Sequence, residues 1–474
     1  MNTTSTTLNN NISPDSYRDR LSSVGKYGER KWVFAQKPKG KFYNARTYVS
    51  WFFFALFFAM PFIEYNGQPF FLFNIPKATF IIFGKIFWPQ DFFIFGLTMV
   101  TFIVFIILFT AAFGRLFCGW VCPQTIFMEM LFRKVEYLIE GDAAKQKMLN
   151  NAPFSTEKLV KKTAKHVSFF LLSFIIANTF LSYIIGIKPL WHIITGNFFE
   201  HTAGFGTIVL FSSVFYAVYA FFREQVCTAV CPYGRLQSVL LDKNSMIVAY
   251  DYKRGEPRGK FTKAEDSKLG SCLDCNQCIK VCPTGIDIRN GTQMECVGCT
   301  ACIDACNDMM VKTNRPFGLI RYVSENNIES GEPLQYTTRM KLYTGLLSTL
   351  IIILFTLLMT RKDIDATIMR TPGMLYQERG TDSISNLYNI KIANKTVKEI
   401  PLTLRMESDG GKVDVIGGTI IPVKKQDESA GNFFVILSKD QLHNRKTKIK
   451  IGLYEGNRKI DVISTNFLAP NGMN

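Results

Sequence analysis

The sequence from Cys272 to Cys306 reads CLDCNQCIKVCPTGIDIRNGTQMECVGCTACIDAC and contains eight cysteines in two matching runs. In each run, three cysteines are separated by two residues, and a fourth cysteine follows after three more. Three thiolates at this spacing bind one four-iron four-sulfur cluster, and the fourth thiolate reaches the neighbouring cluster. We therefore predict one cluster on Cys272, Cys275, Cys278 and Cys306 and a second cluster on Cys296, Cys299, Cys302 and Cys282.

Zinc ribbons and disulfides explain these cysteines less well. A zinc ribbon uses two CxxC pairs and does not need eight thiols. A secreted disulfide scaffold would be short, whereas this chain has 474 residues and its 12 cysteines all lie between Cys118 and Cys306. Two clusters in one short domain would lie close enough to exchange electrons. The sequence therefore predicts a bacterial-type ferredoxin domain with two clusters, which we place at residues 241–335.

Long apolar runs indicate that the chain also contains a membrane domain. The composition is 47% hydrophobic with 42 Phe, and a spanning helix needs about 20 mostly apolar residues. We predict five spanning helices, at residues 47–63, 92–113, 167–187, 204–222 and 342–360. Residues 69–88 are also apolar, but Pro76, Lys77 and Lys85 interrupt them, so we expect an interfacial or re-entrant segment there.

The net charge of +17 is explained by membrane topology better than by nucleic-acid binding. Lys and Arg are frequent before the first predicted span, in residues 115–165 and in residues 223–339, and are rare in the other loops between spans. Because Lys and Arg beside spanning helices stay in the cytoplasm, these three segments are predicted to be cytoplasmic. The first of them comprises residues 1–46, and the tail after residue 360 is predicted to lie outside.

The tail after residue 362 has a different pattern. Short runs of alternating apolar and polar residues, such as 388–393, 400–406 and 448–454, are separated by turn residues. Period-two alternation broken by turns predicts an all-β sandwich of about a hundred residues. The predicted order of domains after the N-terminal segment is a helical membrane bundle at 47–240, the ferredoxin domain, a fifth span at 336–362 and the sandwich at 363–474.

Four further cysteines occur in a repeated element that follows two of the predicted spans. CGWVCP begins at Cys118 after the second span, and CTAVCP begins at Cys227 after the fourth span. If the helix continues to each proline, residues four apart share one face, and both pairs would lie at the cytoplasmic membrane boundary. A single site could then be formed by Cys118, Cys122, Cys227 and Cys231.

These membrane cysteines have two interpretations. A buried cysteine is often only a small apolar packing residue. Two matched pairs that each end in proline favour instead a site for redox exchange or for a soft metal such as copper. We expect Arg115, Arg223 and Arg235 to lie nearby and to favour thiolate over thiol. His192 and His201, in a short loop predicted to lie outside, could ligate copper or bind a quinone headgroup, although His is also an ordinary residue of membrane boundaries.

Taken together, these motifs resemble the FixG/CcoG/RdxA family of membrane polyferredoxins. The resemblance rests on the two CxxxCP elements, on the eight-cysteine run and on RPFGLIRYVSEN at residues 315–326, which precedes the final span. YNIKIANK at residues 388–395 resembles that family's immunoglobulin-like extracytoplasmic domain. The CxxxCP element alone is shared with quinol dehydrogenases of the NapH/NosR type.

The resemblance implies a protein of the bacterial inner membrane with a cytoplasmic ferredoxin domain and a periplasmic immunoglobulin-like domain. It implies an accessory protein for assembly of high-affinity haem–copper cytochrome c oxidases, acting as a cupric reductase that prepares Cu(I) from Cu(II). The eight cysteines of the two runs correspond to the family's cluster ligands, and the four membrane cysteines to its catalytic or copper-binding thiols. The implied partners are the lipid bilayer, copper ions, oxidase-assembly or copper-delivery proteins, and a quinol or another electron donor.

Two alternatives to cupric reduction stay open from the sequence. One is a quinol-linked subunit of the NapH/NosR type, which would move electrons between the quinone pool and a periplasmic partner. The other is a regulatory membrane module in which the clusters sense oxygen and the β-domain binds a partner. An interaction domain outside the membrane suits delivery to an assembly partner, and this favours cupric reduction.

Overall fold

The computed structural model describes residues 22–470 except for positions 26, 28, 66, 77–78, 88–91, 198, 260–268, 334, 362–363, 381, 397–398, 409, 419, 425–426 and 443. The chain forms two compact units. The first comprises residues 1–63 and 95–353, and the second comprises residues 64–94 and 354–474. Each unit has hydrophobic cores of its own. This division into two units does not test the finer domain boundaries, which stay predictions.

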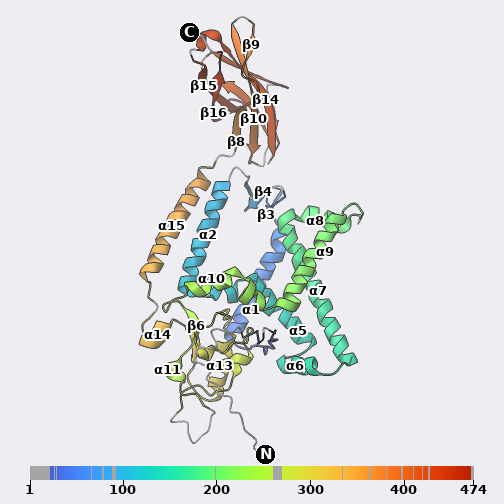
Figure 1. Cartoon of the computed structure of the whole chain (residues 1–474), viewed down its shortest axis with the longest axis vertical. Helices are drawn as coiled ribbons and strands as arrows, with labels where there is room; N and C mark the ends of the chain where they lie inside the picture. The colour runs from blue at the N-terminus through green and yellow to red at the C-terminus, as the bar shows by residue number, and fades with distance from the viewer. Residues whose placement is uncertain are drawn as a thin grey trace, which may run out of the picture. The chain divides into compact units, whose positions relative to one another are not determined.

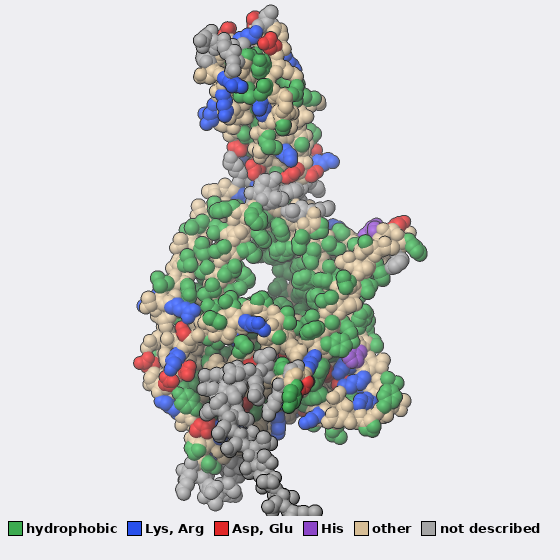
Figure 2. Space-filling view, viewed as in Figure 1, with side chains coloured by type: hydrophobic (Ala, Val, Ile, Leu, Met, Phe, Trp, Pro, Cys, Tyr) green, Lys and Arg blue, Asp and Glu red, His purple; other side chains and the backbone are tan. Residues whose placement is uncertain are grey.

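Five helices among the described residues are long and apolar enough to cross a membrane, as the sequence predicts. They are α1 (Lys41–Ala59) with the 3₁₀ turn η1 (Met60–Phe62), α2 (Phe92–Phe113), α7 (Thr156–Ile185), α9 (Thr202–Ala217) with the π-helical turn η4 (Val218–Phe222), and α15 (Thr338–Met359). Helix α7 begins well before the predicted span, because the Ser155 side chain caps a polar first segment by accepting from the N–H of Lys158. Hydrophobic side chains cover these helices (Figure 2), as a surface that faces lipid requires.

A series of short helices connects α2 to α7 in the first unit. They are α3 (Leu116–Trp120), α4 (Pro123–Phe127), the π-helical turn η3 (Met128–Phe132), α5 (Arg133–Ile139) and α6 (Ala143–Asn151). Phe132 stacks on Tyr219 of η4 with ring centroids 4.3 Å apart, and Phe127 stacks on Phe54 of α1 at 5.3 Å. Helices α7 and α9 lie side by side (Figure 1). The aromatic contacts therefore fix the segment after the first CxxxCP element against three of the long helices.

The predicted ferredoxin domain follows the π-helical turn η5 (Val226–Val230) and α10 (Pro232–Leu240). Strand β6 (Ile247–Tyr250) pairs with the antiparallel strand β7 (Ile320–Val323). The short helices of this region are α11 (Tyr252–Gly255), α12 (Gln277–Lys280), η6 (Ile288–Asn290), α13 (Ala301–Lys312) and α14 (Glu325–Ser330). Val248, Tyr250, Ile303 and Leu319 pack with the cysteines in one core. The cysteine loops are thereby held between the two strands and α13.

The second unit contains the predicted β-sandwich. One sheet has the strand order β12-β14-β10-β8 with β9 beside β10, the other has the order β13-β11-β15-β16, and every pair is antiparallel. The strands are β8 (Ile364–Arg370), β9 (Gln377–Arg379), β10 (Ser383–Asn394), β11 (Ile400–Met406), β12 (Gly411–Val415), β13 (Ile421–Val423), β14 (Glu428–Ser438), β15 (Lys446–Glu455) and β16 (Arg458–Leu468). The Tyr388 hydroxyl donates to the carbonyl of Asn466 at 2.9 Å. This bond joins β10 to β16 and so links the two sheets.

The described residues between 69 and 87 form strands of the second unit rather than a re-entrant segment. The interfacial alternative stays a prediction. Strand β1 (Glu64–Tyr65) pairs with β2 (Gln68–Pro69), and β3 (Phe71–Asn74), β4 (Thr79–Ile82) and β5 (Lys85–Phe87) form a three-stranded antiparallel sheet. Leu72, Ile81 and Ile86 make a small core. Aromatic and β-branched residues favour strands, and Gly84 at φ 72° supplies the turn between β4 and β5. The segment is therefore not a sixth spanning helix, as the sequence also indicated.

Candidate redox site

The eight cysteines of the two runs line two internal cavities of the first unit. The first cavity is lined by Cys272, Cys275, Cys278 and Cys306. The second is lined by Cys278, Cys282, Cys296, Cys299 and Cys302. None of these cysteines forms a disulfide in the described part of the chain. Each cavity thus contains the three closely spaced thiols of one run and the fourth thiol of the other run, and Cys278 lines both cavities. The assignment of these thiols to two clusters stays a prediction.

Helix α13 explains how one short element serves both cavities. Thr300 adopts a left-handed backbone with φ 63° and starts the helix immediately after Cys299. Cys302 and Cys306 are four residues apart on this helix, so they share one face. Cys302 lines the second cavity and Cys306 lines the first. The separation of the two groups of thiols is therefore built into one turn of helix.

Paired charges support the wall of the first cavity. Arg289 lines this cavity, and its guanidinium contacts Asp274 at 2.6 Å and Asp287 at 2.7 Å. Burial alone would raise the pKa of Asp287, but the hydrogen bonds from Arg289 outweigh it and hold that pKa below its ordinary value. The Arg289 side chain is only 7% exposed. The arginine thus remains paired and fixes the loop that carries Asp274 between two of the predicted cluster ligands.

Both CxxxCP elements break the helix at the second cysteine, which differs from the predicted continuous helix. Helix α3 ends at Trp120, Cys122 is extended with ψ 122°, and α4 begins at Pro123. In the second element, Cys231 is extended with ψ 113° and α10 begins at Pro232. The helix breaks at the second cysteine because the residue before a proline disfavours the α conformation. The argument that residues four apart share a helix face therefore does not hold here.

Hydrogen bonds and turns repeat in the same way in both elements. The N–H of Cys122 donates to the carbonyl of Phe117 at 2.9 Å, and the N–H of Cys231 donates to that of Val226 at 2.7 Å. A residue with positive φ precedes each element: Gly114 at 57° and Arg223 at 50°. The two elements are therefore a structural repeat, each at the end of a long apolar helix.

The fold brings the two elements together. The Cys118 thiol lies 3.1 Å from the side-chain oxygen of Gln237, which is on the helix that follows the second element. The Cys227 sulfur lies 3.9 Å from the hydroxyl of Thr125, which is on the helix that follows the first element. These reciprocal contacts place Cys118 beside α10 and Cys227 beside α4. A single site formed by all four membrane thiols stays a prediction.

The expected thiolate character of these cysteines is not found, and burial is the reason. Burial raises the pKa of the Cys118 thiol to about 12, although Arg115 opposes the shift. Burial likewise raises the pKa of Cys227 to about 12. Arg223 is paired with Glu136 at 2.7 Å, and Arg235 is exposed. Burial therefore favours the thiol form of Cys118 and Cys227, and a coordinated metal ion would displace the proton.

The first CxxxCP element touches the second cysteine run directly. A Cβ atom added to Gly119 would lie 2.6 Å from the carbonyl oxygen of Gly298, which is between Cys296 and Cys299. The Arg115 guanidinium donates to the carbonyl of Cys296 at 3.2 Å and to that of Gly234 at 2.5 Å. Arg115 thus bridges the run to α10.

Two further side chains support this junction. Arg46 Nε donates to the carbonyl of Gly119 at 2.6 Å, and the Tyr322 hydroxyl donates to that of Gly298 at 2.9 Å. Arg46 is on α1 and Tyr322 is on β7, so elements far apart in the sequence meet here. Sequence reasoning missed these two residues and the two glycines. The available signal was the glycine in CGWVCP and the glycine between Cys296 and Cys299, since glycine inside a motif is typical of close backbone approach.

Family models match three parts of the chain. A model of the 4Fe-4S dicluster domain matches residues 222–325, and a model of the 4Fe-4S binding domain matches residues 95–140. A model described as the IG-like fold at the C-terminal of FixG matches residues 354–470. Protein RdxA of Cereibacter sphaeroides is 30% identical over 414 residues, which cover 84% of this chain and 87% of RdxA. The chain belongs to the FixG/RdxA family.

Other relatives agree with this placement. Nitrogen fixation protein FixG of Rhizobium meliloti is 33% identical over 306 residues, covering 63% of this chain and 58% of FixG. Protein RdxB of Cereibacter sphaeroides is 29% identical over 447 residues, covering 90% of this chain and 92% of RdxB. A crystal structure of a FixG-related protein from Vibrio parahaemolyticus matches 23% of this chain and 97% of its own, with 17% identity and a TM-score of 0.20. This member of the FixG/RdxA family is an iron–sulfur electron-transfer protein with an immunoglobulin-like C-terminal domain.

The two histidines of the loop around residue 195 also come together. His192 is on α8 (Ile187–Thr195), and its ring centroid lies 5.0 Å from that of His201. His192 and Trp191 line an apolar cavity of about 610 Å³. Nε2 of His201 is buried and has no hydrogen-bond partner among the described residues. The structure thus brings the two histidine rings together, and His192 alone of the pair lines the cavity.

Proposed function

We propose that this protein is a membrane-bound cupric reductase that converts Cu(II) to Cu(I) for assembly of a haem–copper cytochrome c oxidase. The observation that supports this most strongly is the contact between Gly119 and Gly298, because it joins a pair of membrane thiols to the loop of a predicted cluster. Soft thiolates select Cu(I), so a site of four thiols favours the reduced product. The bound clusters would supply one electron for each copper ion.

Each group of residues has a separate role in this proposal. The eight thiols of the two cavities would hold the clusters, since they are free and the rest of the lining of both cavities is largely apolar. The four thiols of the CxxxCP elements would be the catalytic groups that receive copper. Thr125 and Gln237 contact the thiols of Cys227 and Cys118 and would orient them. Arg115, through its carbonyl contacts, would keep the catalytic thiols in register with the second cluster loop.

The proposed location follows from the distribution of charge. The ferredoxin domain would lie in the cytoplasm of a bacterium and the five helices in its inner membrane. The immunoglobulin-like domain would lie in the periplasm, where it would bind an oxidase-assembly or copper-delivery protein.

The experiment compares copper reduction by the wild type with that of a variant carrying Cys118→Ser and Cys231→Ser. The full chain is purified without oxygen, and its iron content and visible spectrum are measured. The protein is then reduced, freed of excess reductant and mixed with Cu(II), and the Cu(I) that forms is trapped with a specific chelator. We expect the variant to keep about eight irons and its spectrum while losing copper reduction. A Cys299→Ser variant serves as the control, since it should lose iron as well as activity. Unchanged copper reduction in the first variant would remove the membrane thiols from the mechanism.

A second candidate function is oxidation of a quinol. The cavity of about 610 Å³ lined by Trp191 and His192 favours it, because the cavity is apolar apart from a few polar groups, among them Asn178 and Ser182. A quinol ring could be bound there, with His192 accepting its proton. Anaerobic mixing with a reduced short-chain quinol tests this function. We expect the quinol to reduce the clusters of the wild type but not those of a His192→Ala variant, while dithionite reduces both. Equal reduction of both proteins by the quinol would argue against quinol oxidation at this cavity.

A further inference from the structure

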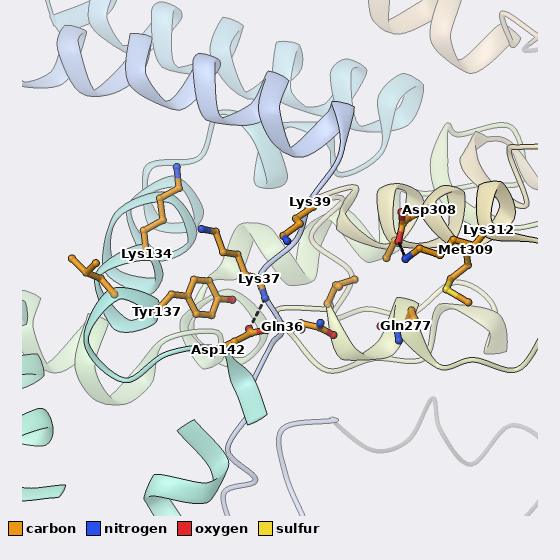
Figure 3. Close-up of a pocket in the computed structure, with 13 residues that line it drawn as sticks. Gln36, Lys37, Lys39, Lys134, Tyr137, Asp142, Gln277, Asp308, Met309 and Lys312 are labelled. Carbon is orange, nitrogen blue, oxygen red and sulfur yellow. Dashed lines mark hydrogen bonds and ion pairs between the residues drawn. The ribbon is translucent and has the colours of Figure 1, made fainter. Parts of the chain in front are cut away.

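A cleft rich in lysine lies beside the first cluster cavity. It has a volume of about 810 Å³, within the range of about 300–1,000 Å³ that is typical of small-molecule sites. Three parts of the first unit form it: residues 36–39, the region of α5 up to Asp142, and the ferredoxin helices α12 and α13. In Figure 3, Lys37 and Lys39 lie between Lys134 on one side and Met309 and Lys312 on the other.

The cleft carries positive charge that the protein does not neutralise. Lys312 is paired with Asp308 at 2.6 Å. Lys37, Lys39 and Lys134 have no carboxylate within ion-pair distance among the residues described. The Asp142 carboxylate accepts instead from the backbone N–H groups of Lys37 and Ala143, at 3.0 and 2.8 Å.

The positive side chains around the cleft also affect the pKa of Lys134. Burial, with further contributions from Lys37 and Arg46, lowers the pKa of the Lys134 ammonium. An anion placed among these lysines would relieve that repulsion and form charge-assisted hydrogen bonds. The site is therefore suited to a phosphate group.

The opposite wall of the cleft is shared with the first cluster cavity. Gln277 and Met309 line both spaces. Val281 and Ala305, which also line the cleft, directly precede the predicted ligands Cys282 and Cys306. Tyr137 and Leu138 add an aromatic and an apolar surface, and the Leu138 side chain is 85% exposed. A flat ring bound against this wall would be separated from the first cluster cavity only by side chains that line both spaces, such as Met309.

We propose that the cleft binds a reduced flavin mononucleotide, with its phosphate on Lys37, Lys39 and Lys134 and its ring toward Met309 and Tyr137. The proposal rests on the proposed function, since it identifies the electron donor for the same clusters. A nicotinamide transfers two electrons as a hydride, whereas a flavin can release one electron at a time. In the transfer, the flavin loses one electron and releases a proton to water, and the adjoining iron–sulfur centre gains that electron.

The first test measures binding by equilibrium dialysis of oxidised flavin mononucleotide against the full chain in a neutral detergent. We expect Lys37→Glu combined with Lys134→Glu to weaken binding by about tenfold or more, because each reversal replaces attraction to the phosphate by repulsion. Riboflavin, which lacks the phosphate, should bind the wild type as weakly as the mononucleotide binds the variant. Lys280→Glu is the matched control, since this exposed lysine is on α12 but does not line the cleft. Equal binding of both flavins, or equal loss in the control, overturns the proposal.

The second test separates this proposal from the proposed function. Photoreduced flavin mononucleotide and dithionite are each mixed with the anaerobic protein, and bleaching of the iron–sulfur absorption is followed. We expect the double variant to be bleached about tenfold more slowly by the flavin and at the wild-type rate by dithionite. If the flavin bleaches the wild type and the variant equally, electrons do not enter through the cleft, although the clusters are present and reducible. If dithionite bleaches neither protein, the proposed function fails, and equilibrium dialysis alone then tests whether the cleft binds the flavin. A Lys134→Gln variant with intermediate affinity and full iron content guards against misfolding of the double variant.

Discussion

Gly119 of the first CxxxCP element packs directly on Gly298 of the second cysteine run, and a Cβ atom at residue 119 would lie 2.6 Å from the carbonyl oxygen of Gly298. Neither position leaves room for a side chain, since a Cβ atom at Gly298 would lie 2.9 Å from the carbonyl oxygen of Arg115. The two loops that carry the candidate redox thiols are therefore held at backbone contact.

The first prediction concerns this junction. Gly119→Ala should push the two loops apart and lower copper reduction by about tenfold or more, since small displacements of reacting groups are costly. Both clusters should remain, as judged by iron content and visible spectrum. Gly345→Ala is the control, because a Cβ atom there meets nothing within 4 Å. Equal rates for the two variants would contradict a role for the junction in electron transfer.

The second prediction tests the exchange of the fourth cysteine between the runs. Cys306→Ser should remove or alter the cluster of the first run, although Cys306 belongs to the second run. Its electron paramagnetic resonance spectrum should therefore match that of Cys275→Ser and differ from that of Cys282→Ser. About four irons should remain in each variant. A match between Cys306→Ser and Cys299→Ser would show that each run binds its own cluster.

The third prediction concerns the buried ion pairs of Glu136. Its carboxylate contacts Arg223 at 2.7 Å and Lys165 at 3.4 Å. Glu136→Gln would remove the carboxylate that pairs with the buried Arg223, whereas Lys165 would keep Glu140 at 2.9 Å. The change should lower the free energy of unfolding by about 3–5 kcal/mol, measured by thermal or denaturant unfolding in detergent. Glu157→Gln is the control, because this carboxylate pairs with Lys161 at an exposed site. It should change the free energy of unfolding by less than about 1 kcal/mol.

The pH dependence of stability follows from the same carboxylate. Burial would raise the pKa of Glu136, but Arg223 and Lys165 outweigh burial and hold that pKa below its ordinary value of 4.5. A carboxylate with a lowered pKa stabilises the fold above its ordinary pKa, and this stabilisation is lost as the pH falls through the lowered value. Unfolding curves of the wild type and of Glu136→Gln should therefore converge as the pH is lowered below about 4.5. Parallel curves down to the lowest pH would argue against this pair as the source.

The fourth prediction tests membrane sidedness. A reporter enzyme that is active only outside the cytoplasm, fused after residue 474, should be active, because five spans place the two ends of the chain on opposite sides. The same reporter fused after Lys253 of the ferredoxin domain should be inactive. Activity of the second fusion alone would invert the proposed topology.

The cysteine groups could be predicted from sequence because cluster ligands follow local spacing. The two predicted sets line two neighbouring cavities, with Cys278 lining both, and their assignment to clusters stays a prediction. The spans and the strands around Tyr388 were also predictable, since apolar length and alternation are local properties. Local patterns could not reveal that Gly119 meets Gly298, because that contact depends on the packing of distant loops. The expectation of thiolates at Cys118 and Cys227 was wrong for a related reason. It considered nearby arginines but not burial, which depends on the whole fold.

Cys302 and Cys306 leave α13 one turn apart, and a turn of α-helix rises about 5.4 Å. Any tilt or shift of this helix therefore carries a ligand of each predicted centre with it. Thermal motion of the surrounding loops would then change the positions of the two centres together rather than their spacing. Electron tunnelling between them depends on that spacing, so its rate should be nearly insensitive to the fluctuations that docking of a partner imposes on the rest of the domain.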